Sequence, residues 1–173
     1  MSVTIRPVTP TDAAAITRIY GDAVLHGTAS FELEAPDEAE MTRRMRVLLD
    51  GNFPYLVAEI AGEVVGYAYA GLYRTRPAYR FTLEDSIYVD QGVQGRGVGR
   101  ALIERLLADS EARGFRQMIA VIGDSAQTAS IALHRAAGFH YVGNIQNVGY
   151  KFGRWLDSVI MQRPLGPGAL TKP

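Results

Sequence analysis

Three glycines, Gly95, Gly97 and Gly99, alternate along the chain directly before a segment with helical periodicity. Glycine has no Cβ, so the backbone of such a loop approaches a ligand closely, and the amides at a helix N-terminus point toward an anion. The pattern therefore predicts a cradle for a pyrophosphate between a strand and a helix. Arg96 and Arg100 add positive charge without specifying the ligand. A glycine-rich turn that binds nothing is the open alternative.

Two common phosphate motifs do not match this loop. No Lys-Ser/Thr pair follows the glycines, so it is not a Walker loop, and Arg100 occupies the position of the third glycine of a dinucleotide fingerprint. A dinucleotide-binding loop is also expected after the first strand of a βαβ unit. Here the loop lies in the middle of the chain.

Hydrophobic periodicity predicts seven strands and four helices in the order β, α, α, β, β, β, α, β, α, β, β. The expected strands cover residues 3–7, 55–60, 64–73, 81–89, 118–122, 139–145 and 155–162. The expected helices begin near residues 12, 36, 98 and 125. This order predicts a mixed sheet with helices on both faces.

The length of 173 residues favours a single domain, which we expect to cover residues 1–163. Residues 164–173 are rich in proline and glycine, and we expect a flexible C-terminal tail there. The sequence contains no cysteine, which excludes disulfides, thiolate zinc sites and a cysteine nucleophile.

Net charge and hydropathy limit the kinds of partner that this protein is expected to bind. Eighteen basic residues balance eighteen acidic ones, so no overall field attracts nucleic acid or an anionic membrane. No stretch approaches the roughly 20 apolar residues that span a bilayer, and the first residues contain no apolar signal core. We expect a cytoplasmic protein that binds no metal.

The segment Gln94–Gly99 matches the Q/R-x-x-G-x-G/A signature of the GNAT acetyltransferase superfamily. With the strand Ser86–Val89 before it and Ile131–Phe139 after it, the chain resembles that family over most of its length. The segments Arg80–Val89 and Val148–Asp157 resemble more narrowly the phosphinothricin and methionine sulfoximine (sulfone) acetyltransferase branch. The resemblance implies an α/β (α+β) fold with a mixed, mostly antiparallel central sheet. Helices would flank both faces, and the sheet would splay at the strand that carries Ile87–Val89.

The resemblance also implies acetyl-CoA as co-substrate. The amides of the splayed strand would bind pantetheine, and the glycine loop would hold the pyrophosphate. The implied cofactor-binding residues are Ile87, Tyr88, Val89, Gly95, Arg96, Gly97, Val98, Gly99, Arg100, Gln127 and Ser130. Gln127 departs from the family, which usually has an asparagine there, but a glutamine amide is long enough to make the same contact.

Acetyl transfer to an amine requires a base for the ammonium, polarisation of the thioester carbonyl and a proton for the thiolate. By resemblance, Glu84 occupies the position of the general base. The amide of Val89, or one near it, would polarise the carbonyl. His134 stands where many members carry a tyrosine that protonates the thiolate. The alternatives are a surface role for Glu84 and a capping or core role for His134.

Arg74, Arg76 and Arg80 lie within seven residues and no acid interrupts them. Guanidinium groups bind carboxylates and phosphinates bidentately. The branch resemblance supports a set of substrate-binding residues at this end of the strand. That set is Arg74, Thr75, Arg80, Asp85 and Ser86, beside Glu84. A solvated loop is the alternative.

Phe31 and Trp155 are candidates for the walls of the substrate site, because aromatic surfaces give shape and exclude water. Both are equally typical of core or interface positions.

Together these features predict an N-acetyltransferase that acts on the α-amine of a phosphinothricin-like or methionine-derived amino acid by direct attack on the thioester. One alternative is an enzyme that acetylates peptide N-termini or other amines. Another is a non-catalytic module that binds acyl-CoA. The branch resemblance further implies a homodimer.

Overall fold

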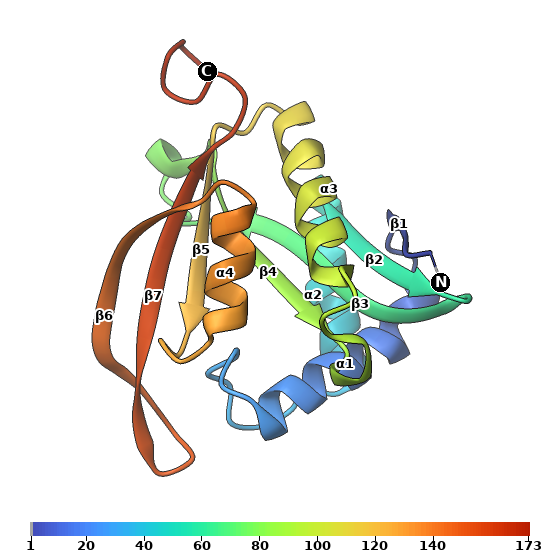
Figure 1. The fold of residues 1–173 in the computed structure, drawn as a ribbon. Coiled ribbons are helices and arrows are strands. Elements are labelled where there is room, and N and C mark those ends of the chain that lie inside the picture. The colour runs from blue at the N-terminus through green and yellow to red at the C-terminus, as the bar shows by residue number, and fades with distance from the viewer. Residues whose placement is uncertain (1) are drawn as a thin grey trace.

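A seven-stranded sheet in the order β1-β2-β3-β4-β5-β7-β6 crosses the whole molecule (Figure 1). The computed structural model describes residues 2–173. The strands are β1 (Thr4–Pro7), β2 (Tyr55–Ile60), β3 (Glu63–Leu72), β4 (Thr82–Val89), β5 (Gln117–Gly123), β6 (His140–Lys151) and β7 (Arg154–Pro164). Only the β4–β5 pair is parallel, and all other neighbours are antiparallel. The predicted mixed, mostly antiparallel sheet is confirmed.

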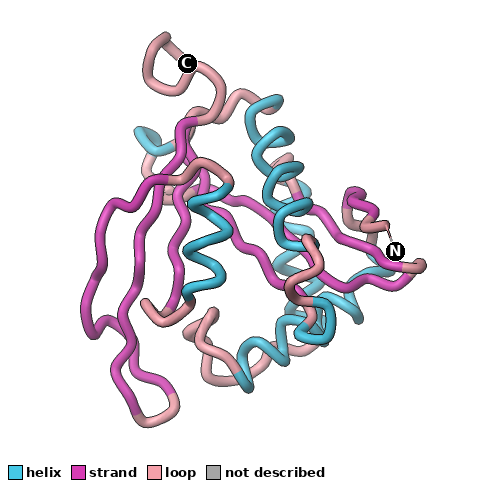
Figure 2. The backbone as a smooth tube through the Cα atoms, in the orientation of Figure 1, coloured by secondary structure: helices cyan, strands magenta, loops and turns pink. Residues whose placement is uncertain are grey.

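Four α-helices pack on this sheet, in the predicted order (Figure 2). They are α1 (Ala13–His26), α2 (Glu38–Asp50), α3 (Val98–Ala112) and α4 (Thr128–Ala136). Three short 3-10 turns cover Pro10–Asp12, Pro77–Tyr79 and Gln91–Val93. Asp37 caps α2 by accepting a 2.8 Å hydrogen bond from the Glu40 amide, as expected for an acidic N-terminus.

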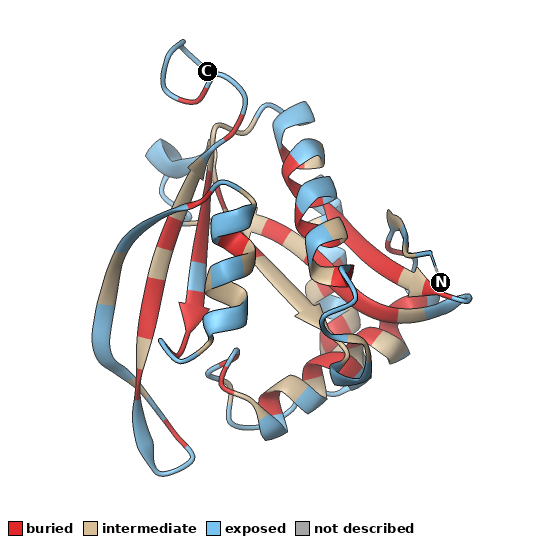
Figure 3. Cartoon of the chain, in the orientation of Figure 1, coloured by how far each residue is buried: buried red, intermediate tan, exposed pale blue. Residues whose placement is uncertain are grey.

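The sheet separates two hydrophobic cores, because successive side chains of a strand point to opposite faces. In β2, Leu56 and Ala58 join the core beneath α3 and α4, whereas Tyr55 and Val57 join the core beneath α1 and α2. Figure 3 shows buried residues on β2, β3, β5 and β7 and along one side of α1 and α3, whereas most of β4 is of intermediate burial. Both faces of the sheet are therefore covered by helices.

The last two strands are longer than the sequence predicted. They meet at Phe152 and Gly153, both with positive φ (52° and 72°), which is the conformation of a tight two-residue hairpin turn. Polar residues and glycines in β6 obscured its alternation, and the pairing is irregular between Ile145 and Gly149.

The core extends two residues past the predicted domain boundary at residue 163. Leu165 is 1% exposed, and its amide donates to the Arg116 carbonyl. The Arg116 guanidinium also donates to the Gly168 carbonyl, the Thr171 hydroxyl and the Lys172 carbonyl. Proline and glycine content alone did not reveal these contacts. Within residues 2–173, no helix has both the length and the apolar character that crossing a membrane requires.

Candidate active site

Strands β4 and β5 pair only over their first halves. The parallel register runs from Thr82 opposite Gln117 to Asp85 opposite Ala120 and then stops, while β5 continues along β7. The Phe81 carbonyl accepts from the amides of Arg116 and Gln117 on the β5 side, and the Thr82 carbonyl accepts from the Tyr73 amide just after β3. Backbone groups alternate along a strand. The amides of Ile87 and Val89 therefore face the open side of β4, where β5 has left it.

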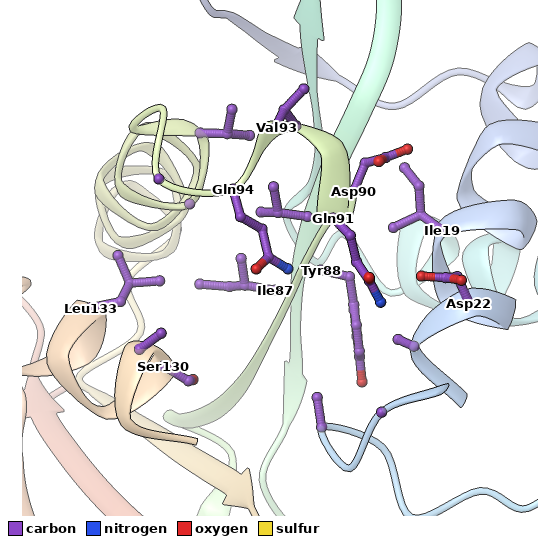
Figure 4. A pocket seen from close by; sticks show the side chains of 18 of the residues that line it. Ile19, Asp22, Ile87, Tyr88, Asp90, Gln91, Val93, Gln94, Ser130 and Leu133 are labelled. Atoms are coloured by element: carbon purple, nitrogen blue, oxygen red, sulfur yellow. The ribbon is translucent and has the colours of Figure 1, made fainter. Parts of the chain in front are cut away.

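A cavity of about 760 Å³ lies at this splay, between α1, α3 and α4. Figure 4 shows Ile87 on the strand between Ser130 of α4 on one side and Asp22 of α1 on the other. All of the predicted cofactor-binding residues except Arg96 line it: Ile87, Tyr88, Val89, Gly95, Gly97, Val98, Gly99, Arg100, Gln127 and Ser130.

The glycines of the loop have two different structural roles. Gly95 and Gly97 have φ of 75° and 82°, which glycine adopts without strain, and a Cβ at either would meet no atom within 4 Å. Gly97 precedes the first residue of α3, so the helix N-terminus opens into the cavity. A Cβ at Gly99 would lie 3.3 Å from Leu133 Cδ2, so this glycine allows α3 and α4 to pack closely.

The sequence did not identify the wall that α1 contributes. Arg18, Ile19, Asp22 and Ala23 line the cavity from that helix. Arg18 forms a 2.6 Å ion pair with Asp90 at the end of β4. No local motif marks these residues, because tertiary packing alone brings α1 to the splay.

Glu84 lies on the α1–α2 face of β4, directly across from Gly71 of β3. Its side chain is half-buried, and no hydrogen bond or ion pair to it is formed within the described residues. Burial raises the pKa of Glu84, the charge of Arg74 lowers it, and Asp85 raises it further, with a net upward shift. An unpartnered carboxylate with a raised pKa has the properties of a general base.

Asp85 lies on the other face, which differs from its predicted place on the substrate side. The alternation of β4 turns it toward α4, where its Oδ2 is 2.9 Å from His134 Nε2. Asp85 and His134 are both buried. They line a recess of about 60 Å³ that also contains Ser86 and adjoins the larger cavity at Ile87. The structure thus brings Asp85 to the second predicted catalytic residue.

The arginine loop joins β3 to β4. Arg74, Thr75 and Arg80 are exposed and line neither cavity. The Arg74 and Arg80 guanidinium groups lie over the rings of Tyr73 (4.1 Å) and Phe81 (4.5 Å). In the described chain neither forms an ion pair with a carboxylate, so both positive charges are available to an anionic ligand.

The two aromatic candidates differ. Phe31 packs against Gly123 and Gly149, and a Cβ at Gly123 would lie 2.8 Å from the ring. Phe31 thus covers the ends of β5 and β6 beside the α1–α2 loop. Trp155 is 61% exposed on the β6–β7 hairpin, lies against Tyr150 and lines neither cavity. The structure does not bring Trp155 to the site within one chain.

Polar contacts fasten the α1–α2 loop beside the cavity. Thr28 donates a 2.8 Å hydrogen bond to Asp124, which also accepts from Arg154 at 2.7 Å. Gln127 donates its amide N–H to Thr28 Oγ1 at 3.0 Å, and Lys151 donates to the Ser30 carbonyl. The Gln127 nitrogen is therefore engaged within the protein, while its residue still lines both cavities.

Metal binding has no support from the described residues, because they contain no cluster of three metal-ligating side chains. The geometry instead provides an exposed strand edge, a glycine cradle at a helix N-terminus and an unpartnered carboxylate.

Comparison with known proteins identifies the class. The family model "Acetyltransferase (GNAT) domain" matches residues 5–160, and the chain belongs to this family. It is 53% identical over 170 residues to the phosphinothricin N-acetyltransferase of Alcaligenes faecalis, covering 98% of this chain and 86% of that protein. It is 41% identical over 165 residues to the L-methionine sulfoximine/L-methionine sulfone acetyltransferase of Salmonella typhimurium, covering 94% and 95%.

A solved structure matches the whole fold. The phosphinothricin acetyltransferase of Sinorhizobium meliloti, in complex with AcCoA, superposes with a TM-score of 0.97 at 49% identity. The match covers 100% of this chain and 94% of that one. The resemblance noted in the sequence is confirmed over its full length.

Proposed function

We propose that this chain is an acetyl-CoA-dependent N-acetyltransferase that acetylates the α-amine of a small amino-acid-like substrate of the phosphinothricin, methionine sulfoximine or methionine sulfone type. The main observation behind this proposal is that the open edge of β4 lies beside the unpartnered carboxylate of Glu84. A base at Glu84 would lie on the same strand that would hold the thioester. The named activities of the Alcaligenes and Salmonella relatives support the substrate class.

The cavity fits acetyl-CoA. The backbone amides of Ile87 and Val89 face the gap, as hydrogen-bond donors to the amide groups of pantetheine. The loop from Gly95 to Arg100 presents amides at the start of α3, where a helix dipole favours a diphosphate. Arg100 also lines this part of the cavity, where its guanidinium forms a 2.7 Å ion pair with Glu104.

Glu84 would accept the proton of the substrate ammonium, directly or through a water molecule. Its raised pKa suits a base that works near neutral pH. The free amine then attacks the thioester carbonyl, and the Val89 amide donates to the developing oxyanion. His134 is the group that we assign to the proton of the departing thiolate.

Positive charge distinguishes the proposed substrate-binding end of the site. Phosphinothricin carries a carboxylate and a phosphinate, and guanidinium groups bind both bidentately. Arg74 and Arg80 provide guanidinium groups in the loop before β4, and Thr75 in that loop and Ser86 within β4 add hydroxyl groups. This favours a free amino acid over a peptide N-terminus, because a peptide lacks a carboxylate beside its amine. Glu84 favours an enzyme over a non-catalytic acyl-CoA module, which would need no base.

We also propose a homodimer formed through the β6–β7 hairpin. Seven apolar side chains of this hairpin are each at least half exposed: Tyr141, Val142, Ile145, Val148, Tyr150, Phe152 and Trp155. β6 is an edge strand of the sheet. A long apolar edge is typical of an interface. Trp155 would then border the site from the partner or the interface.

For localisation, a cysteine-free chain suits the cytoplasm, which we propose as its compartment.

Thiol release from acetyl-CoA tests the function with a panel of amines: phosphinothricin, methionine sulfone, methionine sulfoximine, plain amino acids, a peptide and a polyamine. We expect saturable release with the first three. Arg80→Ala should raise KM for the amino acid far more than KM for acetyl-CoA, whereas Arg46→Ala, exposed on α2, should change neither. Release with the peptide or polyamine alone would reject the substrate class. No release with any amine would favour the acyl-CoA module.

A further inference from the structure

Asp85 and His134 form a buried ion pair beside the splay, with side chains 2% and 6% exposed. His134 Nδ1 lies 2.8 Å from the Ser130 carbonyl oxygen, and Nε2 lies 2.9 Å from Asp85 Oδ2. A carbonyl oxygen only accepts, so Nδ1 carries a hydrogen. The contact between Nε2 and a carboxylate oxygen then requires one proton shared between them. The two residues thus hold one proton as a unit.

The surroundings leave Asp85 as the only charged partner of His134 within the described chain. The edge of the Phe139 ring lies against the imidazole at 5.0 Å between ring centres. From β5, the recess is lined by uncharged residues only: Ala120, Val121, Ile122 and Gly123. Burial lowers the pKa of His134, but the hydrogen bond to Asp85, the charge of Asp85 and the Ser130 carbonyl together raise it by more, so the net shift is upward. Without the carboxylate, burial alone would favour the neutral ring.

The recess connects this pair to the proposed acetyl-CoA site. It has room for a water molecule and shares Ile87 and Ser130 with the larger cavity. The second carboxylate oxygen of Asp85, Oδ1, is buried and has no hydrogen-bond partner in the described residues. Buried carboxylate oxygens normally have a hydrogen-bond partner, and the recess has room for a water molecule to serve as the partner of Oδ1. Such a water would lie between the ion pair and the larger cavity.

We propose that Asp85 is a positioning residue that keeps His134 protonated beside the splay, so that His134 supplies the proton of the departing CoA thiolate. The inference rests on the proposed function. In the step, the amine nitrogen bonds to the acetyl carbon, and the carbon–sulfur bond breaks with its electron pair on sulfur. The proton shared by His134 and Asp85 goes to that sulfur through water in the recess. Glu84 passes the ammonium proton to solvent before the attack, and it then takes one proton from the amine nitrogen as the amide bond forms. Exchange with solvent restores Glu84 and His134.

Asp85→Asn separates this role from packing. An asparagine amide keeps a hydrogen bond to His134, by donating to a neutral Nε2, but removes the charge. We expect the pKa of His134, measured by NMR, to fall in the variant. We expect the alkaline limb of the kcat profile for methionine sulfone to move down with it. At neutral pH, kcat should fall about tenfold, with KM for acetyl-CoA nearly unchanged.

The chain has only three histidines, so each NMR signal can be assigned by single substitution. His140→Gln, exposed at the start of β6, is the matched control and should leave the kcat profile in place. In the wild-type protein alone, the alkaline limb should coincide with the pKa of His134. This comparison uses only the wild-type protein, so it can be made even if Asp85→Asn does not fold. An alkaline limb that does not coincide with the pKa of His134 would overturn the inference.

The possible outcomes distinguish failure of the proposed function from failure of this inference alone. If the wild-type protein acetylates no amine of the panel, the proposed function and this inference fail together. If it does acetylate, and the pKa of His134 falls in Asp85→Asn while the kcat profile stays in place, only the inference fails. The ion pair is then a tie between α4 and β4.

Discussion

Glu84 and Asp85 are consecutive residues of β4, and their carboxylates lie on opposite faces of the sheet. Glu84 faces α1 and α2, across from Gly71, whereas Asp85 contacts His134 of α4. The period of two in a strand imposes this separation. In the proposed mechanism, this separation keeps the carboxylate assigned as the base apart from the carboxylate that contacts the proposed proton donor, His134.

Glu84→Gln should lower kcat by about 10²-fold or more, because the amide cannot accept the ammonium proton. The affinity for acetyl-CoA, measured by calorimetry, should stay the same. Burial raises the pKa of Glu84, and a base acts only when ionised. In the wild-type protein kcat/KM should therefore rise with pH through a pKa above 4.5, and this acid limb should be absent from the variant.

Glu63→Gln provides the control for this substitution, since Glu63 is exposed at the start of β3. It should retain wild-type turnover at every pH. Unchanged turnover in Glu84→Gln would reject the assignment of the base.

Gly97→Ala and Gly114→Ala form a matched pair for the cradle. The two glycines have φ of 82° and 85°, and a Cβ at either meets no atom within 4 Å. Each alanine should therefore cost about 1–2 kcal/mol of stability by backbone strain alone. Only Gly97 lines the cavity. Gly97→Ala should also weaken acetyl-CoA binding, whereas Gly114→Ala should leave it unchanged. Equal affinities in the two variants would contradict the diphosphate site.

The sequence predicted the features that depend on neighbouring residues. The glycine loop, the order of strands and helices, and the position of Glu84 follow from local patterns. The contact between Asp85 and His134 joins residues 49 positions apart, and the contact between Thr28 and Asp124 joins residues 96 apart. Such pairs depend on how strands and helices pack, which periodicity does not encode. For the same reason, α1 was not expected at the cavity.

Tyr150→Lys should disrupt the proposed dimer, because a lysine ammonium at the centre of the exposed apolar hairpin would have to be desolvated. We expect the wild-type protein to have twice the mass of the 18.9 kDa chain in light scattering, and the variant to have the monomer mass. Val47→Lys is the control, since Val47 is equally exposed on α2, away from the hairpin. A wild-type monomer would reject the interface.

Asp124→Asn should loosen the α1–α2 loop and lower stability in a pH-dependent manner. Asp124 has φ of 73°, which asparagine tolerates, so the substitution removes the charge and keeps the backbone. Burial raises the pKa of Asp124, but hydrogen bonds from the Ala126 amide, Arg154 and Thr28 lower it by more. We expect a loss of about 1–3 kcal/mol at pH 7, from the weakened hydrogen bonds to the carboxylate.

The direction in which stability changes with pH follows from the linkage between proton binding and folding. A folded-state pKa below the unfolded value of 3.8 adds stability above that value, and this stability is lost as the pH falls through the folded pKa. The difference in unfolding free energy between the wild-type protein and Asp124→Asn should therefore shrink as the pH is lowered from 5 to below 3. Urea unfolding at each pH measures it. Asp50→Asn, exposed at the end of α2, is the control and should leave the free energy of unfolding at pH 7 nearly unchanged. A difference that stays constant with pH would show that the charge of Asp124 does not hold the loop.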